Sequence, residues 1–360
     1  MKNLGSLQYK YYENNFNLIR FMAACLVMYS HSFALAISPD AEPLRDYIGM
    51  TLGKVSVDIF FVISGFLLVK SIYSKNDVLE YFVARSLRIF PLLILVVLFT
   101  ALVLSPALSA FGFVEYFNFE VVKYILLNST LIIGLKDDLP GVFTNNPFPN
   151  AINGSLWTLP YEIRMYAILA GLWFLSRYVK SNLSKLFIPT VAALALFGYN
   201  FGILSYTPGD PGLRLCWMFF LGGTLYLYRE IIPTVSPFYS VTLLAISFFF
   251  YPELFEALHL IVTPYLVVYF GLSKTRFICK FNRFGDGSYG IYIFAFPVQQ
   301  TFVYTGVEDP LYLFFCTSLV VIPLAYLSWW YFESKIMKLK VPIYNFMLSS
   351  CMIKNNDKIK

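Results

Sequence analysis

Charged residues are scarce in this chain of 360 residues: only 13% are Asp, Glu, Lys or Arg, while 58% are hydrophobic and 19% are aromatic. Soluble domains carry roughly 25% charged residues, so this deficit excludes an ordinary water-soluble protein. With a mean hydropathy of +0.65, the chain needs lipid as its main solvent. The formal net charge is +6, but the basic residues lie between apolar segments and form no single patch. This distribution argues against nucleic acid as a partner.

Cysteine and histidine are also rare, and neither forms a metal-binding pattern. The five cysteines are scattered, without Cys-x-x-Cys or Cys/His spacing. The sequence therefore predicts neither a disulfide framework nor a metal site, and no permanently bound cofactor. The polar start MKNLGSLQYKYYENN lacks the short apolar stretch of a cleavable signal, so none is expected.

Long apolar runs make up most of the sequence. A helix that crosses a bilayer needs about 20 mostly apolar residues, and eleven segments approach this length. The sequence therefore predicts an all-α, polytopic membrane helix bundle. The candidate segments lie near 17–37, 55–73, 91–110, 120–135, 156–176, 186–204, 213–228, 236–250, 254–271, 288–303 and 309–332.

Positive charge helps to decide which segments cross. Lys and Arg gather in cytoplasmic loops, and eleven crossings would place the basic loops near 177–185 and 274–283 outside. If 111–154 does not cross as a net span, both loops and both basic ends of the chain lie inside. We therefore expect about ten crossings, cytoplasmic termini, and a re-entrant or interfacial segment at 120–135. Eleven crossings with an unusual charge pattern are the alternative.

The expected organisation is one membrane domain over 13–335, with cytoplasmic tails at 1–12 and 336–360. No internal repeat and no second soluble domain is visible in the sequence. The one long loop, 136–154, is rich in Pro, Gly and Asn. Long irregular loops often form lids or entrances.

Two titratable residues share a face of the first apolar segment. Arg20 and His31 are eleven residues apart, which is about 16 Å and almost three full turns of an α-helix. Ionisable side chains in lipid are costly enough to mark functional sites, and imidazole exchanges protons near neutral pH. His31 is therefore a candidate catalytic residue, with a carbonyl-bonded structural histidine as the alternative. The other histidine, His259, has no matching pattern and is predicted to be structural.

A second basic pair lies in VLEYFVARSLRIFPLL. Arg85 and Arg88 are three residues apart, so they share one face of a helix, and ten crossings place them at the same cytoplasmic boundary as Arg20. Guanidinium groups bind phosphate bidentately and stay charged. The three arginines are candidate binding residues for a phosphate-bearing ligand, and anchoring to anionic lipid is the simpler alternative.

The segment NGSLWTLPYEIRMY places a carboxylate inside the apolar layer. A buried Glu162 needs a partner, and His31 is the most useful one that the sequence offers. Trp157 and Tyr161 are typical of an aromatic wall against a sugar ring, or of an interfacial aromatic belt.

The segment KVSVDIFFVISGFLLVKSIY holds two supporting candidates. Asp58, near its outer end, could orient a partner or cap the helix. Ser64 could act as a nucleophile, but its neighbour Gly65 favours close helix packing.

Five blocks, taken in order, resemble the bacterial acyltransferase family 3 membrane proteins: FNLIRFMAACLVMYSHSF, VSVDIFFVISGFLLVKS, ARSLRIFPLL, NGSLWTLPYEIRMY and FNRFGDGSYGIYIFAFPVQQ. The resemblance extends over about 13–335. It implies a multi-pass enzyme of the bacterial inner membrane that transfers an acyl group, usually acetyl, from cytoplasmic acyl-CoA to a cell-surface carbohydrate. Such acceptors include lipopolysaccharide O-antigen, peptidoglycan, exopolysaccharide and lipo-oligosaccharide.

The family pattern falls on Arg20 and His31, on Arg85 and Arg88, and on Glu162. Many relatives have a histidine just before the proline of the last block, whereas this chain has Phe296. The resemblance therefore implies that His31 acts alone or with a carboxylate.

Two classes of function follow. In the first, the chain is an O-acyltransferase with acetyl-CoA as its co-substrate, a carbohydrate or lipid-linked glycan as acceptor, and membrane lipid around it. The arginines hold the phosphates, His31 is the general base or accepts the acyl group, and Glu162 polarises His31. In the second, the chain is a transporter or flippase for a glycan or small anion, and the same residues line a path. Such folds often contain inverted repeats, and the sequence has none.

Overall fold

The computed structural model describes residues 3–7, 14–179, 182–203, 207, 209–273, 275 and 278–356, and these residues form helices and loops without a strand. The prediction of an all-α protein is confirmed. The α-helices are α1 (Phe16–Ala36), α2 (Arg45–Ile48), α3 (Leu52–Lys75), α4 (Val78–Phe99), α5 (Ser105–Leu108), α6 (Phe113–Tyr116), α7 (Phe119–Thr130), α8 (Leu159–Tyr178), α9 (Phe187–Phe201), α10 (Pro211–Leu227), α11 (Pro237–Phe250), α12 (Pro252–Leu272), α13 (Ser288–Tyr304), α14 (Pro310–Ser328), α15 (Ser334–Lys338) and α16 (Lys340–Asn356).

Six helical stretches of the described residues are long and apolar enough to cross a membrane, so the chain is a helical membrane protein. They are Phe16–Ala36, Leu52–Lys75, Val78–Leu108, Ser184–Phe201, Pro252–Leu272 and Pro310–Ser349. The expected spans at α8, α10, α11 and α13 do not reach the same combination of length and apolar composition; α11, for example, has 14 residues. Helix α7 has 12 residues and is about 18 Å long, too short for a hydrocarbon core of about 30 Å.

A short turn joins the two helices that carry Asp58 and Ser64 (α3) and Arg85 and Arg88 (α4). Thr51 begins α3 by accepting a hydrogen bond from the Lys54 amide, and α3 ends at Asn76 in the left-handed conformation. Asp77 then begins α4 by accepting from the Glu80 amide at 2.8 Å. Because both caps are supplied by the sequence itself, the chain ends α3 and begins α4 within two residues, Asn76 and Asp77.

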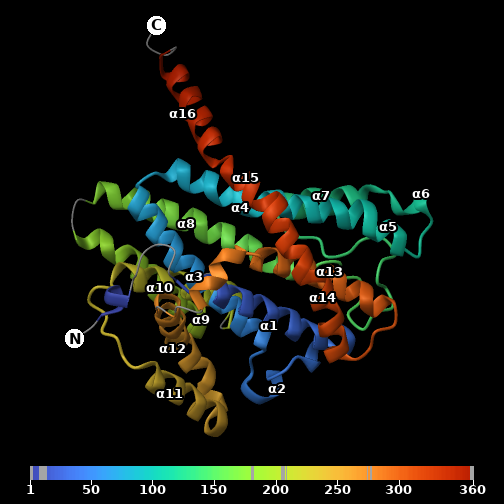
Figure 1. Cartoon of the computed structure of the whole chain (residues 1–360), viewed down its shortest axis with the longest axis horizontal. Helices are drawn as coiled ribbons and strands as arrows, with labels where there is room; N and C mark the ends of the chain where they lie inside the picture. Colours follow the sequence, from blue (N-terminus) through green and yellow to red (C-terminus); the bar gives the residue numbers. More distant parts are fainter. Residues whose placement is uncertain are drawn as a thin grey trace.

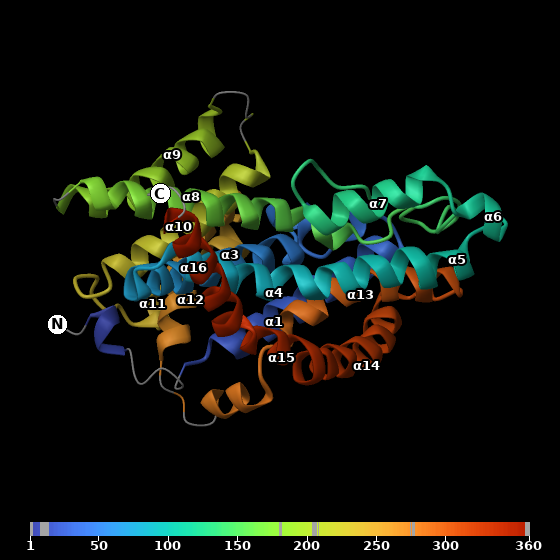
Figure 2. The same ribbon diagram turned by 90° about the horizontal axis from the view of Figure 1, so that it is seen from above.

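Helices α1 and α3 lie inside the bundle, between α8 and α9 on one side and α14 on the other (Figures 1 and 2). The closest approach is between α3 and α10. A Cβ atom on Gly65 would lie 1.8 Å from the Phe219 carbonyl oxygen, and one on Gly222 would lie 2.3 Å from the Val62 carbonyl oxygen. Glycine is therefore required on both helices, as expected for the Ser64–Gly65 step.

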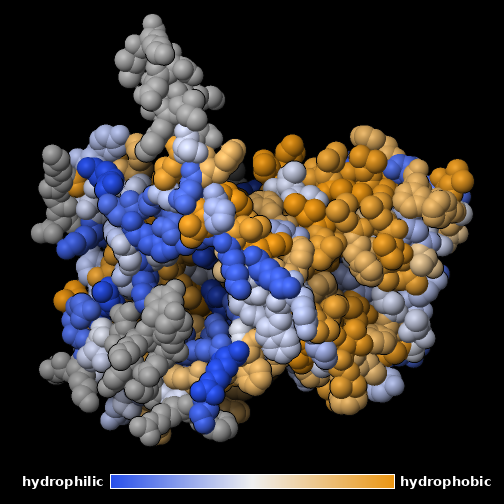
Figure 3. All heavy atoms as spheres, turned by 45° about the horizontal axis from the view of Figure 1, so that its top comes forward, coloured by the Kyte–Doolittle hydropathy of each residue, from blue (hydrophilic) through white to orange (hydrophobic). Residues whose placement is uncertain are grey.

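The face of the molecule seen in Figure 3 has an apolar and a polar half. Apolar side chains gather over the half that holds α5, α7 and α14, and polar side chains gather over the opposite half (Figure 3). Helix α16 projects from this polar side (Figure 1). It contacts α4 through Tyr344, whose hydroxyl donates to Asp77 at 2.5 Å. Much of the expected tail 336–360 is thus helical, whereas residues 1–2, 8–13 and 357–360 of the expected tails and domain boundary lie outside the described residues.

Candidate active site

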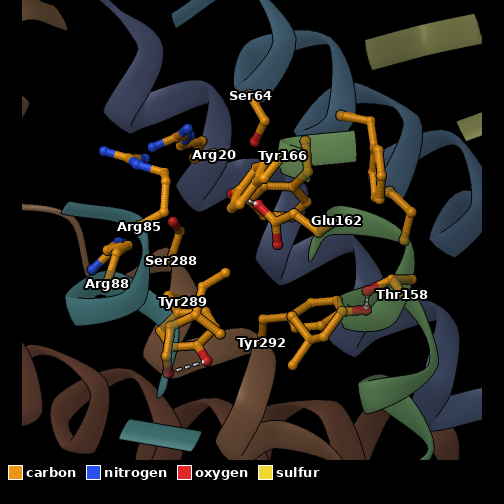
Figure 4. Close-up of a pocket in the computed structure, with 15 residues that line it drawn as sticks. Arg20, Ser64, Arg85, Arg88, Thr158, Glu162, Tyr166, Ser288, Tyr289 and Tyr292 are labelled. Atoms are coloured by element: carbon orange, nitrogen blue, oxygen red, sulfur yellow. Dashed lines mark hydrogen bonds between the residues drawn. The ribbon is translucent and has the colours of Figure 1, made fainter. Parts of the chain in front are cut away.

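A small polar cavity lies where α1, α3, α4, α8 and α13 meet (Figure 4). Its volume is about 90 Å³, so it can take a phosphate-sized group of a donor rather than a whole coenzyme A molecule. Three arginines lie along one side, with Tyr289 beside Arg88, and Glu162, Tyr166 and Tyr292 face them (Figure 4). The polar lining residues are Arg20, Ser64, Arg85, Arg88, Thr158, Glu162, Tyr166, Ser288, Tyr289 and Tyr292. The predicted meeting of the three arginines is therefore present, and Ser64 joins them on the wall.

Two of the three arginines are already paired with carboxylates. Arg88 Nη2 lies 2.8 Å from Asp286 Oδ2, and Arg88 Nη1 lies 2.7 Å from Glu333 Oε2. Arg20 Nη1 lies 3.1 Å from the same Asp286 oxygen. Burial raises the pKa of the Asp286 carboxyl, but Arg88 and Arg20 outweigh it and hold the pKa at about 2. The cluster therefore carries much less net positive charge than three arginines suggest.

Asp286 and Glu333 were missed by the sequence reasoning. Asp286 precedes α13, and Glu333 ends a π-helical segment, Trp329–Glu333, that continues α14. A signal was available, because a guanidinium buried in an apolar layer requires a counterion, and Asp286 lies inside the quoted block FNRFGDGSYG. Only the packing of α4 against α13 and α14 shows which acid is used.

Arg85 is different from its two neighbours. It lines the cavity (Figure 4), yet it forms no ion pair with any residue that the structure describes. The positive charge of Arg85 acts on Tyr166, which also lines the cavity. Arg85 is therefore the cavity arginine with its hydrogen-bond donors available for an anionic ligand.

Glu162 points into the cavity opposite the arginines (Figure 4). It accepts a hydrogen bond from the hydroxyl of Tyr166, one helical turn further along α8. Trp157 and Tyr161, predicted as an aromatic wall, do pack edge to face at 5.9 Å between ring centroids, but they are not on the cavity wall. Arg164 lies over the Tyr161 ring at 5.3 Å and so faces away from Glu162.

His31 lies at the other end of α1, off the cavity wall. Its ring meets the Phe296 ring edge to face, 5.5 Å between centroids. Its Nδ1 atom is buried and has no hydrogen-bond partner among the described residues. The structure does not bring Glu162 to His31, which corrects the expected pairing. The physical reason is length: Glu162 and Arg20 share one cavity, and His31 is about 16 Å further along α1.

Tyr292 lines the cavity from α13, one helical turn before Phe296, the residue that contacts His31. Its hydroxyl hydrogen-bonds Thr158 Oγ1 at 2.7 Å and donates to the Ser155 carbonyl oxygen at 2.7 Å. One residue earlier, Gly154 lies against the Phe296 ring, which in turn contacts His31. The contacts between the two candidate regions therefore run through the 3₁₀ helix Gly154–Thr158, which precedes α8, and through α13.

The long loop 136–154 is anchored on α13 rather than free. Asn146 Nδ2 donates to Gln300 Oε1 at 2.7 Å, and Asn153 Nδ2 donates to the Ile293 carbonyl oxygen at 2.9 Å. Phe148 packs edge to face on Phe296 at 6.0 Å. The loop thus packs on the middle of α13, where Phe296 contacts His31.

Asp58 belongs to a separate buried network away from the cavity. Arg214 Nη1 contacts Asp58 Oδ1, and His259 Nε2 lies 2.9 Å from Asp58 Oδ2. The other ring nitrogen of His259 hydrogen-bonds Thr263 Oγ1 at 2.8 Å. Asp58 therefore orients a partner, but that partner is His259, and both ring nitrogens of His259 are satisfied. This agrees with a structural histidine that ties α12 to α3.

These features define the chain as a helical membrane protein with a buried, charged cavity and a half-buried histidine beyond it. A family model described as an acyltransferase domain matches residues 13–330. The chain therefore belongs to this acyltransferase family, and the resemblance found in the sequence is confirmed. Family membership favours an enzyme over a transporter.

Two proteins similar to the chain match it over nearly the whole length. One is the "O-acetyl transferase" of Shigella phage Sf6, 29% identical over 92% of the chain and 98% of that protein. Another is "Nodulation protein 10" of Rhizobium leguminosarum bv. viciae, 29% identical over 94% of the chain and 97% of that protein. A third, "Exopolysaccharide production protein ExoZ" of Rhizobium meliloti, is 29% identical over 44% of the chain and 46% of that protein. No solved structure matches the chain significantly.

Proposed function

We propose that this protein transfers an acetyl group from cytoplasmic acetyl-CoA to a hydroxyl of a cell-surface or exported glycan. The observation that carries the proposal is the acyltransferase family match over 13–330, joined to a buried cavity with three arginines. The names of the relatives, an O-acetyl transferase and an exopolysaccharide production protein, support acetyl as the group and a polysaccharide as the class of acceptor.

The arginine cavity is the proposed donor end. Arg85 binds a phosphate of the coenzyme, because it has no carboxylate partner among the described residues. Arg20 and Arg88 can shift part of their hydrogen bonding from Asp286 to the donor. Glu162, hydrogen-bonded to Tyr166, then contacts the donor in this cavity and does not polarise His31. Charge-assisted hydrogen bonds of this kind are the strong ones in phosphate recognition.

His31 is the proposed general base. It takes the proton of the acceptor hydroxyl as that oxygen attacks the thioester carbonyl; the new C–O bond forms, the C–S bond breaks, and the proton passes on to the coenzyme thiolate. Its free Nδ1 supports this role, since a base needs an available nitrogen. Tyr292 has to move aside for the donor carbonyl to approach His31.

The proposed setting is the bacterial inner membrane, with about ten crossings and cytoplasmic termini. The charge of the loops supports this arrangement: it places the arginine cavity toward cytoplasmic acetyl-CoA and the His31 end toward an exported glycan. A single membrane domain over 13–335, flanked by tails, follows the extent of the family resemblance.

The test measures both halves of the reaction. Purified protein should release free thiol from acetyl-CoA, and cells with the gene deleted should lose base-labile acetate from their surface glycan. His31→Gln should abolish thiol release and should remove the acetate from the glycan as the deletion does, because a general base contributes roughly 10²–10⁴-fold to the rate. A transporter would release no thiol, and a fully active His31→Gln protein would contradict the role given to His31.

A further inference from the structure

A carboxylate from the loop between α1 and α3 lies against α1 beside His31. Glu42 follows a short 3₁₀ turn, Pro39–Ala41, and accepts a hydrogen bond from Ser30 Oγ on α1. Ser30 is fully buried. A Cβ atom on Gly53, in the first turn of α3, would lie 3.3 Å from Ser30 Oγ and 3.5 Å from Glu42 Oε2. The Glu42 carboxylate is therefore held between α1 and α3 and does not extend into solvent.

His31 directly follows the serine that holds this carboxylate. Burial of the His31 ring disfavours its charged form, and the negative charge of Glu42 acts in the opposite direction. The buried Nδ1 of His31 is unpaired among the described residues. The second oxygen of Glu42 also has no hydrogen bond to any described residue. An unpaired imidazole nitrogen and an unpaired carboxylate oxygen are thus left on the same end of α1.

The other acidic side chain considered for His31 is occupied elsewhere. Glu162 accepts from Tyr166 and lines the arginine cavity, which His31 does not reach. Asp58 is saturated by Arg214 and His259. Neither Glu162 nor Asp58 can therefore stabilise the positive charge that develops on His31 during proton transfer.

We infer that Glu42 is the positioning residue for His31: it stabilises the imidazolium that forms when His31 takes the acceptor proton. This inference rests on the proposed function. An opposite charge at close range in a poorly solvated site stabilises a cation strongly, and the Ser30 hydroxyl fixes the carboxylate so that little is lost in ordering it. Glu42 does not touch the donor cavity, so its effect belongs to the transfer step and not to donor binding.

The test uses the full chain in detergent and measures thiol release from acetyl-CoA, with water as the acceptor. Glu42→Gln keeps an oxygen for Ser30 but removes the charge. We expect it to lower kcat by roughly 10- to 1000-fold, the effect of one to three pKa units of lost stabilisation, with KM for acetyl-CoA unchanged. Asp40→Asn is the matched control: it lies in the same loop, its side chain is 84% exposed and it pairs with Arg45, so its kcat should equal that of the wild type.

A double variant separates positioning from a merely structural role. If Glu42 acts through His31, His31→Gln and the double variant His31→Gln/Glu42→Gln should have the same residual rate. A further drop of the same factor in the double variant would overturn the inference, as would a wild-type kcat for Glu42→Gln. If Glu42→Gln does not accumulate in the membrane, Ser30→Ala decides: a lowered kcat with unchanged KM supports the inference, and an unchanged kcat overturns it.

The two proposals fail in different ways. A wild-type rate for His31→Gln contradicts His31 as the base and with it the proposed chemistry. An inactive His31→Gln protein together with a fully active Glu42→Gln protein overturns the role of Glu42 alone.

Discussion

Replacing Arg88 by alanine tests whether this arginine contributes more to the stability of the fold than to donor binding. Arg88 joins two carboxylates, Asp286 at 2.8 Å and Glu333 at 2.7 Å, and the side chains of all three residues are at most 14% exposed. The substitution leaves both acids in a poorly solvated cluster with Arg20 as the remaining cation near Asp286. We therefore expect a large loss of stability, in addition to any loss of affinity.

The magnitude follows from the geometry. Removing one partner of a buried ion pair costs about 3–5 kcal/mol, because the remaining charge is left uncompensated. Independently, the folded pKa of Asp286 near 2, against an ordinary value of 3.8, corresponds to about 2 kcal/mol for that carboxylate alone. Because this pKa is depressed in the folded protein, the stabilisation is complete above pH ~4 and is lost as the pH falls toward 2.

The assay is thermal unfolding of the purified protein in detergent, followed by tryptophan fluorescence. A loss of about 3–5 kcal/mol lowers the Tm of a chain this long by about 4–7 °C. The variant Arg20→Met/Arg88→Met/Asp286→Asn/Glu333→Gln removes all four charges of the cluster together and should recover most of the Tm, since no charge of the cluster is then left unpaired. Arg85→Ala is the matched control and should leave the Tm nearly unchanged. An equal Tm loss in Arg85→Ala and Arg88→Ala, or no recovery in the neutral variant, would refute the reasoning.

Three further predictions concern binding, stability and topology. Arg85→Ala should weaken acetyl-CoA binding by roughly ten- to a hundredfold, the loss of one charge-assisted contact. Isothermal titration calorimetry measures the affinity, and Arg164→Ala, which lies off the cavity, is the control. Equal affinities in the two variants would favour lipid anchoring as the role of Arg85. His259→Ala should lower the Tm, since it leaves Asp58 with one partner fewer and costs about 1–3 kcal/mol, while thiol release per folded molecule persists; loss of turnover at full stability would make His259 part of the chemistry. Fusion reporters should give a cytoplasmic signal at Asn182 and Thr275. They should give an external signal at Asp40, Asp210 and Glu308. An external signal at Asn182 would restore eleven crossings.

The sequence by itself determined the solvent, the class of fold and the family. These depend on local properties: the length of apolar runs, the scarcity of charge, and short motifs whose residues are neighbours along one helix. Arg85 and Arg88 face the same cavity because three residues are almost one helical turn. Arg20 joins them, while His31, on the same helix, lies far from them because eleven residues rise about 16 Å.

Only the tertiary structure decided which charges meet. Arg20 is 266 residues from Asp286 along the chain, and Arg88 is 245 residues from Glu333, so no spacing rule links them. The expected pair of Glu162 and His31 is not formed, and Glu162 accepts a hydrogen bond from Tyr166 instead. The physical reason is that a buried ion takes the partner that helix packing brings within hydrogen-bond distance. That packing depends on contacts such as Gly65 with Phe219 and Gly222 with Val62, which are made between helices and not along them.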